Sequence, residues 1–295
     1  MKFSIVTPSF RQSDWLRLCV ASVADQEGVE IEHIVQDACS DDGTQDWLPY
    51  DTRVKAFVER DEGMYDAVNR GYRRATGDIL AYLNCDEQYL SGALAAVARF
   101  FESNPQTEVA LAGAIYTDVD GRYICQRNSM VPDPYSIWRR FPVSTCSTFI
   151  RRNVVHSRGL LFDTRWRDSG DFHWVLSLMR SGVRIAAWPG FTSSFTFTGD
   201  NMSRKTNAIR EAQETVNMAP PLARVLRPVW NATHLSRKIC QGHFWLPPMT
   251  YQIYTKSSPC VRTAFHVPRP KTCFWSRFTK SHPVWIEDPR AQAGV

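Results

Sequence analysis

The stretch ERDEGMYDAVNRGYRRATGDILAYLNCDE (residues 59–87) places a helical pattern before a strand and ends on acidic residues. Apolar and small side chains recur at helical spacing over 65–76. The apolar run 79–84 then predicts a buried strand that leads directly to Asp86. A helix followed by a strand with a carboxylate at its end is typical of α/β proteins, whose ligands bind at the carboxyl ends of parallel strands.

The same alternation extends to both sides of this stretch. Strands are predicted at 3–7, 31–36, 54–59, 109–117, 148–151, 184–188 and 191–198, and helices at 15–25, 91–104, 170–181 and 207–218. Acids or a Pro-Ser-Phe turn follow the first strands closely, at Pro8, Phe10, Asp37, Asp61 and Asp86. Parallel strands would bring these residues to one edge of the sheet. We therefore predict an α/β fold with a mostly parallel central sheet flanked by helices.

Composition and cysteine spacing exclude several classes of protein. The chain has 295 residues, and 43% of them are hydrophobic, which is enough for a large core and excludes disorder. Its eight cysteines form no CxxC pair, so we expect neither a zinc ribbon nor a thioredoxin-like site, and we expect free thiols. No signal-peptide pattern and no run of about 18 apolar residues is present. We expect a cytoplasmic protein.

The charge is distributed unevenly along the chain. Residues 1–218 hold 24 basic and 28 acidic side chains, whereas residues 219–295 hold 11 basic and two acidic ones. We predict a mildly acidic domain over 1–218 and a basic extension, rich in proline and tryptophan, over 219–295.

Four segments in order resemble family 2 glycosyltransferases of the GT-A fold. They are FSIVTPSF (3–10), IEHIVQDACSDDGT (31–44), residues 59–87 and DSGDFHWVLSLMRSG (168–182). The similarity covers about residues 3–215. It implies transfer of a sugar from a nucleotide-diphosphate donor, UDP-linked or similar, to a glycan or lipid-linked acceptor. Inversion at the anomeric carbon and a role in bacterial cell-surface polysaccharide biosynthesis are implied as well.

The resemblance implies a divalent cofactor, Mn²⁺ or Mg²⁺, at the end of the strand predicted over 79–84. The family holds this ion with a DxD-like motif, and Asn84-Cys85-Asp86 stands in its place. Asp86 would bind the metal and neutralise the departing diphosphate through it. Asn84 replaces the first acid and would bind a ribose hydroxyl or a metal-bound water, with Glu87 adjoining. The alternative is that Asp86 only caps the next turn.

The resemblance also implies a nucleotide pocket between the first two strands. Asp37 would accept a hydrogen bond from N3–H of uracil or thymine, and Pro8 and Phe10 would line the pocket around the base. Asp42, within the cluster 41–44, would shape the same pocket. An ordinary helix-capping turn is the alternative for this cluster, and both can hold.

The segment that follows Arg60 supplies further implied ligands. Asp61 would bind ribose or base, and Gly63 would permit a close backbone approach or a positive φ. Asp66, Asn69 and Arg70 lie in the first turns of the next helix, and Arg70 would contact phosphate. A plain interaction with the helix dipole is the alternative for Asp66.

An inverting transfer needs a carboxylate that takes the acceptor proton. By resemblance this base is Asp171, with Asp168 as the second candidate, and a helix cap is the alternative for Asp171. His173 is interpreted as structural. The loop 200–205 is expected to be solvated, although Arg204 or Lys205 could balance diphosphate charge.

Eleven basic side chains interleaved with tryptophans favour docking of 219–295 to the anionic inner face of a cell membrane, and a solvated appendage is the alternative. No nucleic-acid-binding motif accompanies the charge, so nucleic acid is not an expected partner. Two other functions stay open. One is a catalytically silent sugar-nucleotide-binding or scaffolding relative, and the other is a nucleotidyltransferase, although TPSFRQSDW lacks a phosphate loop.

Overall fold

The structure, a computed structural model, describes residues 1–199 and 206–273. The loop 200–205, Trp275 and Trp285 lie outside the described residues. Its strands are β1 (Lys2–Ser9), β2 (Glu30–Asp37), β3 (Lys55–Val58), β4 (Ile79–Tyr82), β5 (Glu87–Tyr89), β6 (Val109–Thr117), β7 (Tyr123–Arg127), β8 (Thr148–Arg151), β9 (Ile185–Thr196), β10 (Met249–Thr255) and β11 (Ser258–Val267). Its α-helices are α1 (Ser13–Ala24), α2 (Met64–Arg74), α3 (Ala93–Ser103), α4 (Arg152–His156), α5 (Gly170–Arg180), α6 (Thr206–Asn217), α7 (Pro221–Val225) and α8 (Arg227–Cys240).

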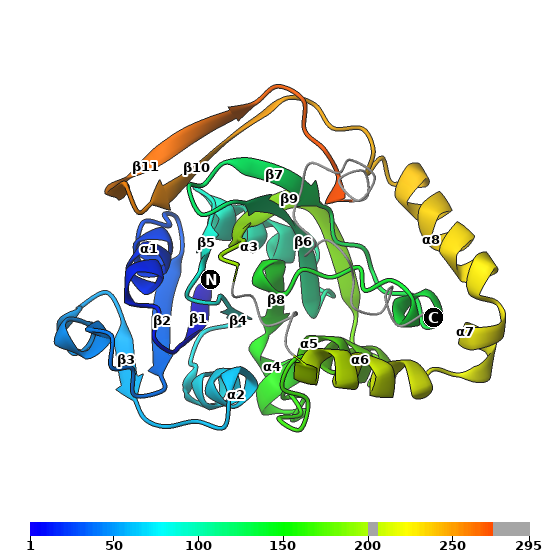
Figure 1. The fold of residues 1–295 in the computed structure, drawn as a ribbon, viewed down its shortest axis with the longest axis horizontal. Coiled ribbons are helices and arrows are strands. Elements are labelled where there is room, and N and C mark those ends of the chain that lie inside the picture. Colours follow the sequence, from blue (N-terminus) through cyan, green and yellow to red (C-terminus); the bar gives the residue numbers. More distant parts are fainter. Residues whose placement is uncertain (200–205, 274–295) are drawn as a thin grey trace.

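One large curled sheet with helices packed around it forms the body of the molecule (Figure 1). Its strand order is β3-β2-β1-β4-β8-β6-β9-β5, and β7 pairs with β6. The four strands β3, β2, β1 and β4 are parallel, as predicted, and Ser9 pairs with Asp37 at their carboxyl end. The second half is mixed, because β8 enters antiparallel to both β4 and β6 while β6 and β9 are parallel. The predicted α/β fold is confirmed. Its parallel half contains the strands β1 to β4, whose carboxyl ends lead to the predicted site residues.

Alternation along β1 explains why helices cover both faces of the sheet. Phe3 and Ile5 lie in one buried cluster with apolar residues of α1 and α3. Val6, which points the other way, lies in a second cluster with residues of α2 and α5. A side-chain carbon on Gly71 of α2 would come within 2.3 Å of Val6 Cγ1, so a glycine is needed for this close approach. The core therefore consists of two layers, one on each side of the sheet.

The hairpin β10–β11 belongs to the same body as the sheet. Tyr251, Ile253 and Val267 are buried in a cluster with Ile115 of β6. In Figure 1 the hairpin (orange) lies beside α1 and near β7, whereas α7 and α8 continue from α6 at the opposite edge. The division into domains at residue 218 stays a prediction, since the extension contains both packed and outlying parts.

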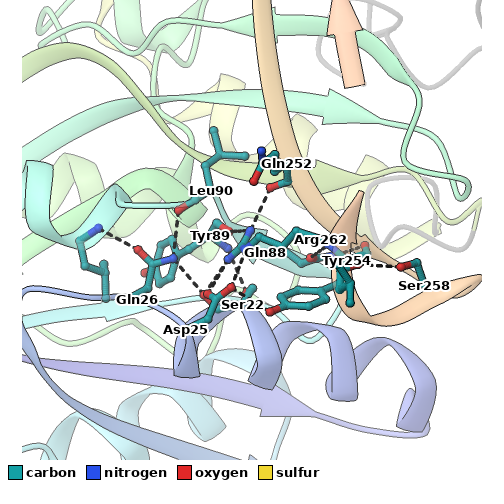
Figure 2. A network of polar contacts seen from close by, with 12 residues as sticks. Ser22, Asp25, Gln26, Gln88, Tyr89, Leu90, Gln252, Tyr254, Ser258 and Arg262 are labelled. Atoms are coloured by element: carbon teal, nitrogen blue, oxygen red, sulfur yellow. Dashed lines mark hydrogen bonds and ion pairs between the residues drawn. The ribbon is translucent and has the colours of Figure 1, made fainter. Parts of the chain in front are cut away.

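A polar network fixes the hairpin to α1 and β5 (Figure 2). The guanidinium of Arg262 donates to both carboxylate oxygens of Asp25, at 2.5 and 2.6 Å. It also donates to the carbonyl oxygens of Tyr89 and Gln252, each at 2.9 Å. The Arg262 side chain is only 8% exposed, whereas the Asp25 side chain is 32% exposed, so the guanidinium but not the carboxylate lies largely out of water. Tyr254 adds a hydrogen bond from its hydroxyl to Asp25 at 2.8 Å.

A disulfide joins Cys125 of β7 to Cys273, with the two Cα atoms 5.2 Å apart. This corrects the expectation that all cysteines are free thiols. The other six cysteines are unpaired. The paired residues are 148 positions apart, and only the fold brings them together. None of the helices in the described ranges is long and apolar enough to cross a bilayer.

Candidate active site

The turn after β2 is built around the carboxylate of Asp37. Its two oxygens accept hydrogen bonds from the backbone N–H of Ser40 at 2.8 Å and from the Ser40 hydroxyl at 2.6 Å. The Asp37 side chain is fully buried. Cys39 in this turn (φ 60°) and Arg11 in the facing turn after β1 (φ 54°) adopt left-handed conformations that are uncommon outside glycine. Asp37 thus holds a strained turn in place, and its predicted contact with a base stays a prediction.

Asp42 stabilises the start of α1 from the neighbouring turn. Its carboxylate accepts hydrogen bonds from the backbone N–H of Ser13 at 2.8 Å and from the Thr44 hydroxyl at 2.6 Å. Burial raises the pKa of Asp42, but these hydrogen bonds outweigh the burial, and the pKa lies below its ordinary value. Asp42 thus links its own turn to the first residue of α1, and its predicted part in the nucleotide pocket stays a prediction.

Pro8 and Phe10 lie on either side of the last residue of β1. Pro8 is buried within the strand, so the strand continues past the proline that was expected to end it. Phe10 is 52% exposed, and the Arg11 guanidinium lies 4.9 Å from the centre of its ring. Phe10 is thus available at the surface of this edge, whereas Pro8 belongs to the core.

The segment before α2 turns at Gly63. Its φ of 124° favours glycine, and a side-chain carbon there would meet nothing within 4 Å, so the backbone angle rather than space requires the glycine. The N–H of Gly63 donates to Asp61 at 2.9 Å. Burial raises the pKa of Asp61, and the nearby charges of Asp66 and Asp37 add to this effect. Asp37 and Asp61 are therefore electrostatic neighbours, as the parallel strands predicted.

Two of the implied ligands on α2 are engaged within the protein. The buried amide of Asn69 donates to the Phe162 carbonyl at 2.8 Å and accepts from the Phe162 N–H at 2.9 Å. Arg70 pairs with Asp66 at 2.8 Å and donates to the Arg60 carbonyl at 2.9 Å. Asn69 thus holds the chain at Phe162, and its predicted contact with the donor stays a prediction. A phosphate contact by Arg70 stays a prediction as well, and it would use N–H groups beside those that bind Asp66 and Arg60.

The end of β4 gathers buried polar groups. The backbone N–H of Asn84 donates to the Glu87 carboxylate at 2.8 Å. The Asn84 Oδ1 atom is buried and has no hydrogen-bond partner in the described residues. Burial raises the pKa of Asp86, and burial together with the Asp86 charge raises the pKa of Glu87. An unpaired buried oxygen beside two carboxylates is a costly arrangement that a cation would relieve.

The residues at this place fit a metal ion that is shared with substrate. Within residues 1–199 and 206–273, no group of three His, Cys, Asp or Glu side chains converges on one point. Mg²⁺ is commonly bound through one or two carboxylates plus substrate phosphates, and its preferred ligands are oxygens. The Asp86 carboxylate and the Asn84 Oδ1 atom, which has no hydrogen-bond partner in the described residues, would supply such oxygen ligands from the protein. The donor set therefore suits an ion that a diphosphate helps to hold.

Asp171 lies in the first turn of α5, which packs directly on α2. The backbone N–H of Asp171 donates to the Tyr65 hydroxyl at 3.1 Å. A side-chain carbon on Gly170 would lie 2.5 Å from Cε2 of Tyr65, so only glycine lets the two helices meet here. One Asp171 oxygen accepts from the N–H of Phe172 at 2.7 Å. Tyr65 thus places Asp171, the predicted base, next to the start of α2, the helix that follows Gly63.

Asp168 is held by residues that the sequence did not single out. Asn207 of α6 donates to Asp168 at 2.5 Å and to Glu211 at 2.8 Å. The Glu211 carboxylate accepts the backbone N–H groups of Arg167, Asp168 and Ser169 at 2.9 to 3.0 Å. Asp168 is therefore tied into this turn, which favours Asp171 as the base. The pattern of α6 contains no signal for these contacts.

Tyr82 lies on β4, two residues before Asn84. Its ring contacts Phe162, which also stacks on Tyr65, the residue that holds the start of α5. Burial raises the pKa of Tyr82 well above its ordinary value, and the charges of Tyr65, Asp171 and Glu87 raise it further. His173, by contrast, stacks on Trp166 and contacts the Thr215 hydroxyl, which agrees with a structural role.

Known proteins share both the sequence pattern and the fold. A glycosyltransferase of PGL/p-HBAD biosynthesis from Mycobacterium bovis is 31% identical over 127 residues, which are 41% of this chain and 50% of that protein. The GalNAc(5)-diNAcBac-PP-undecaprenol beta-1,3-glucosyltransferase of Campylobacter jejuni is 30% identical over 102 residues, 32% and 33% of the two chains. The matched part of this chain spans a third to a half of these relatives' length.

Two solved structures have a similar fold. Staphylococcus aureus TarS 1–349 in complex with UDP-GlcNAc aligns with a TM-score of 0.58 at 19% identity, over 73% of this chain and 64% of that one. The mannosyltransferase PcManGT of Pyrobaculum calidifontis in complex with GDP-Man and Mn²⁺ aligns with a TM-score of 0.53 at 16% identity, over 81% and 75% of the chains. Residues 4–159 match the family described as Glycosyl transferase family 2. This protein is therefore a member of glycosyl transferase family 2.

Proposed function

We propose that this protein transfers a sugar from a nucleotide-diphosphate donor to a hydroxyl of a glycan or lipid-linked acceptor, with inversion, in bacterial cell-surface polysaccharide assembly. The reaction would take place at the inner face of the cell membrane. One observation carries the proposal. Tyr65 docks the start of α5, with Asp171, onto the helix that begins where the strand-end carboxylates gather.

Each part of the reaction has a side chain in a suitable place. Asp171 takes the proton of the acceptor hydroxyl, whose oxygen attacks the anomeric carbon while the bond to the diphosphate breaks. Phe10 and Asp61, at the edge formed by β1 and β3, bind the nucleoside. Asp86, with Asn84 beside it, would hold Mn²⁺ or Mg²⁺. When bound, the ion supplies positive charge that neutralises the leaving diphosphate.

The relatives support the classes of donor and acceptor. TarS is described with UDP-GlcNAc and PcManGT with GDP-Man and Mn²⁺, so nucleotide-sugar donors and a divalent ion are compatible with this fold. The Campylobacter jejuni relative acts on an undecaprenol-linked glycan. A nucleotide sugar as donor and a polyprenol-linked glycan as acceptor are therefore the first substrates to try.

The direct test removes one charge at each half of the site. We expect Asp171→Asn to lower donor turnover about 10²–10⁴-fold, because the acceptor proton loses its base. We expect Asp86→Asn to weaken the dependence of turnover on Mn²⁺. Glu102→Gln, at an exposed acid of α3 outside the site, is the matched control and should leave turnover unchanged. Turnover of a panel of UDP- and GDP-sugars measures all three variants, and wild-type rates in both site variants would contradict the assignment.

A catalytically silent relative is the second candidate, and the replacement of an acid by Asn84 favours it. Thermal shift against the same panel separates the two functions, since ligand stabilisation needs binding but no chemistry. Stabilisation by a nucleotide sugar without any hydrolysis or transfer would identify the silent form. Stabilisation together with turnover supports the transferase.

A further inference from the structure

Helix α8 is attached to the body through one of its faces. Trp230 stacks on Tyr135 with ring centres 4.7 Å apart. Arg237 donates to the Val131 carbonyl at 2.7 Å, and His234 between them is buried. At 100° per residue these three positions share one side of the helix. This side is the inner face of α8.

The opposite side of α8 carries exposed apolar side chains. We define the outer face as Val229, Leu235 and Ile239 of α8 together with Leu222 and Val225 of α7, which are all exposed. Val225 is 75% and Ile239 60% exposed, and Trp245, which follows α8, is 85% exposed. An ordinary surface helix turns its polar side to water, so this pattern is reversed. In Figure 1, α7 and α8 form the edge of the molecule farthest from β3.

The segment that carries the outer face contains basic side chains and no acidic one. No Asp or Glu occurs from residue 215 to residue 286. Arg224 is exposed and Arg227 half-buried in the same segment. Exposed apolar side chains in a basic segment without acids are complementary to a surface that has an apolar interior and anionic groups at its boundary.

We propose that the outer face of α7 and α8 docks on the surface of an anionic lipid bilayer, with its apolar side chains inserted between headgroups. A second copy of this chain fits less well, because a symmetric contact would bring together two segments that carry basic and no acidic side chains. A nucleic acid fits less well too, because the outer face is apolar rather than basic. The bilayer is the occupant that matches both the apolar side chains and the basic charge.

Docking there would serve the proposed transfer to a lipid-linked acceptor, and in this respect it rests on the proposed function. Helix α7 follows α6 after only three residues. Glu211 of α6 holds the turn 167–169, which leads directly to Asp171. The segment that meets the lipid is thus continuous with the segment that holds the predicted base. An acceptor anchored in the bilayer would remain close to this part of the enzyme.

Flotation of the full chain with vesicles tests the inference. We expect binding to vesicles of 70% phosphatidylcholine and 30% phosphatidylglycerol, and weaker binding to pure phosphatidylcholine or at high salt. We expect Val229→Glu/Ile239→Glu to reduce partitioning into anionic vesicles at least about tenfold, because two apolar anchors become charged. Glutamate is a good helix former, so the helix should persist, and circular dichroism checks this.

The matched control places the same charges at exposed apolar positions elsewhere. Tyr50→Glu/Val119→Glu should partition like the wild type. Equal partitioning of both double variants, or no binding of the wild type, would overturn the inference. So would a concentration-dependent dimer, seen by light scattering, that only Val229→Glu/Ile239→Glu abolishes, since it would show a second copy on this face. Donor hydrolysis without vesicles should be the same in both double variants. If the proposed function is wrong, the wild type will show no donor hydrolysis, so this failure is recognised separately from a failure to bind vesicles.

Discussion

The parallel half of the sheet and the hairpin β10–β11 are held in place in different ways. Strands β1, β2 and β4 are buried on both faces by side chains that alternate between two apolar layers. The hairpin buries a few residues such as Tyr251 and Ile253 and depends for the rest on Arg262, whose partner Asp25 lies 237 positions away. The place of the first region thus follows from the alternation of apolar side chains along each strand. The place of the second depends on polar contacts with residues that are distant in the sequence.

Among the variants considered, loss of the disulfide between Cys125 and Cys273, just after the hairpin, should lower stability most. We expect Cys125→Ser/Cys273→Ser to lower the free energy of unfolding by about 5 kcal/mol, because the bond closes a loop of about 150 residues in the unfolded chain. Denaturant unfolding of the oxidised protein measures the change. Cys240→Ser/Cys260→Ser, at two exposed thiols, is the matched control. Unfolding midpoints of the wild type that do not respond to a reductant would show that the bond does not form.

Loss of Arg262 should have the next largest effect. We expect Arg262→Met to cost about 3 kcal/mol, since Asp25 loses its ion pair and keeps the hydrogen bond from Tyr254, while the carbonyls of Tyr89 and Gln252 lose their charged donor. Arg269→Met removes an exposed arginine of the same extension and should cost less than about 0.5 kcal/mol. Equal stability of the two variants would show that the network in Figure 2 is not what holds the hairpin.

A smaller effect is expected from Glu32 in the parallel half. Burial raises the pKa of Glu32, but hydrogen bonds from Lys55, Ser4 and Thr76 outweigh it and lower the pKa to about 2. The unfolded value lies near 4.5, so the carboxylate stabilises the fold above pH 4.5. This stabilisation is lost as the pH falls toward 2. We expect Glu32→Gln to cost about 2 kcal/mol at pH 7 and nothing near pH 2.

Unfolding free energies measured from pH 7 to pH 2 test this expectation. Glu27→Gln, at an exposed acid, should follow the wild type throughout. A constant difference between Glu32→Gln and the wild type at every pH would mean that packing, rather than charge, is responsible.

The sequence predicts the first half of the fold because its strands and helices carry their own periodicity. The strand expected at 109–117 is found at Val109–Thr117, and the helix expected at 170–181 ends one residue earlier, at Arg180. Beyond Pro220 the prediction contained no elements, yet Tyr251, Ile253 and Thr255 alternate with more exposed residues as an edge strand does. The alternation of apolar and polar residues over this strand was present in the sequence, but it is too short to predict a strand by itself.

The site was predictable only in part. The places of Asp61 and Asp86 at strand ends follow from the parallel topology. The contact that Asn69 makes within the protein was not predictable, because its partner Phe162 lies 93 residues away. The correct predictions all rest on patterns within short stretches of sequence. Hydrogen bonds between distant segments form only in the finished fold, so the sequence pattern does not reveal them.

The way the start of α5 is bonded has a consequence for the proposed transfer. The start of a helix, with its free N–H groups and positive dipole end, is a common binding place for phosphate. In α5 the N–H of Asp171 donates to the Tyr65 hydroxyl and that of Phe172 to the Asp171 carboxylate. Just before the helix, the N–H groups of Asp168 and Ser169 donate to Glu211. Under the proposed function these four N–H groups are not available to a diphosphate, so the donor's negative charge would have to be bound elsewhere in the site.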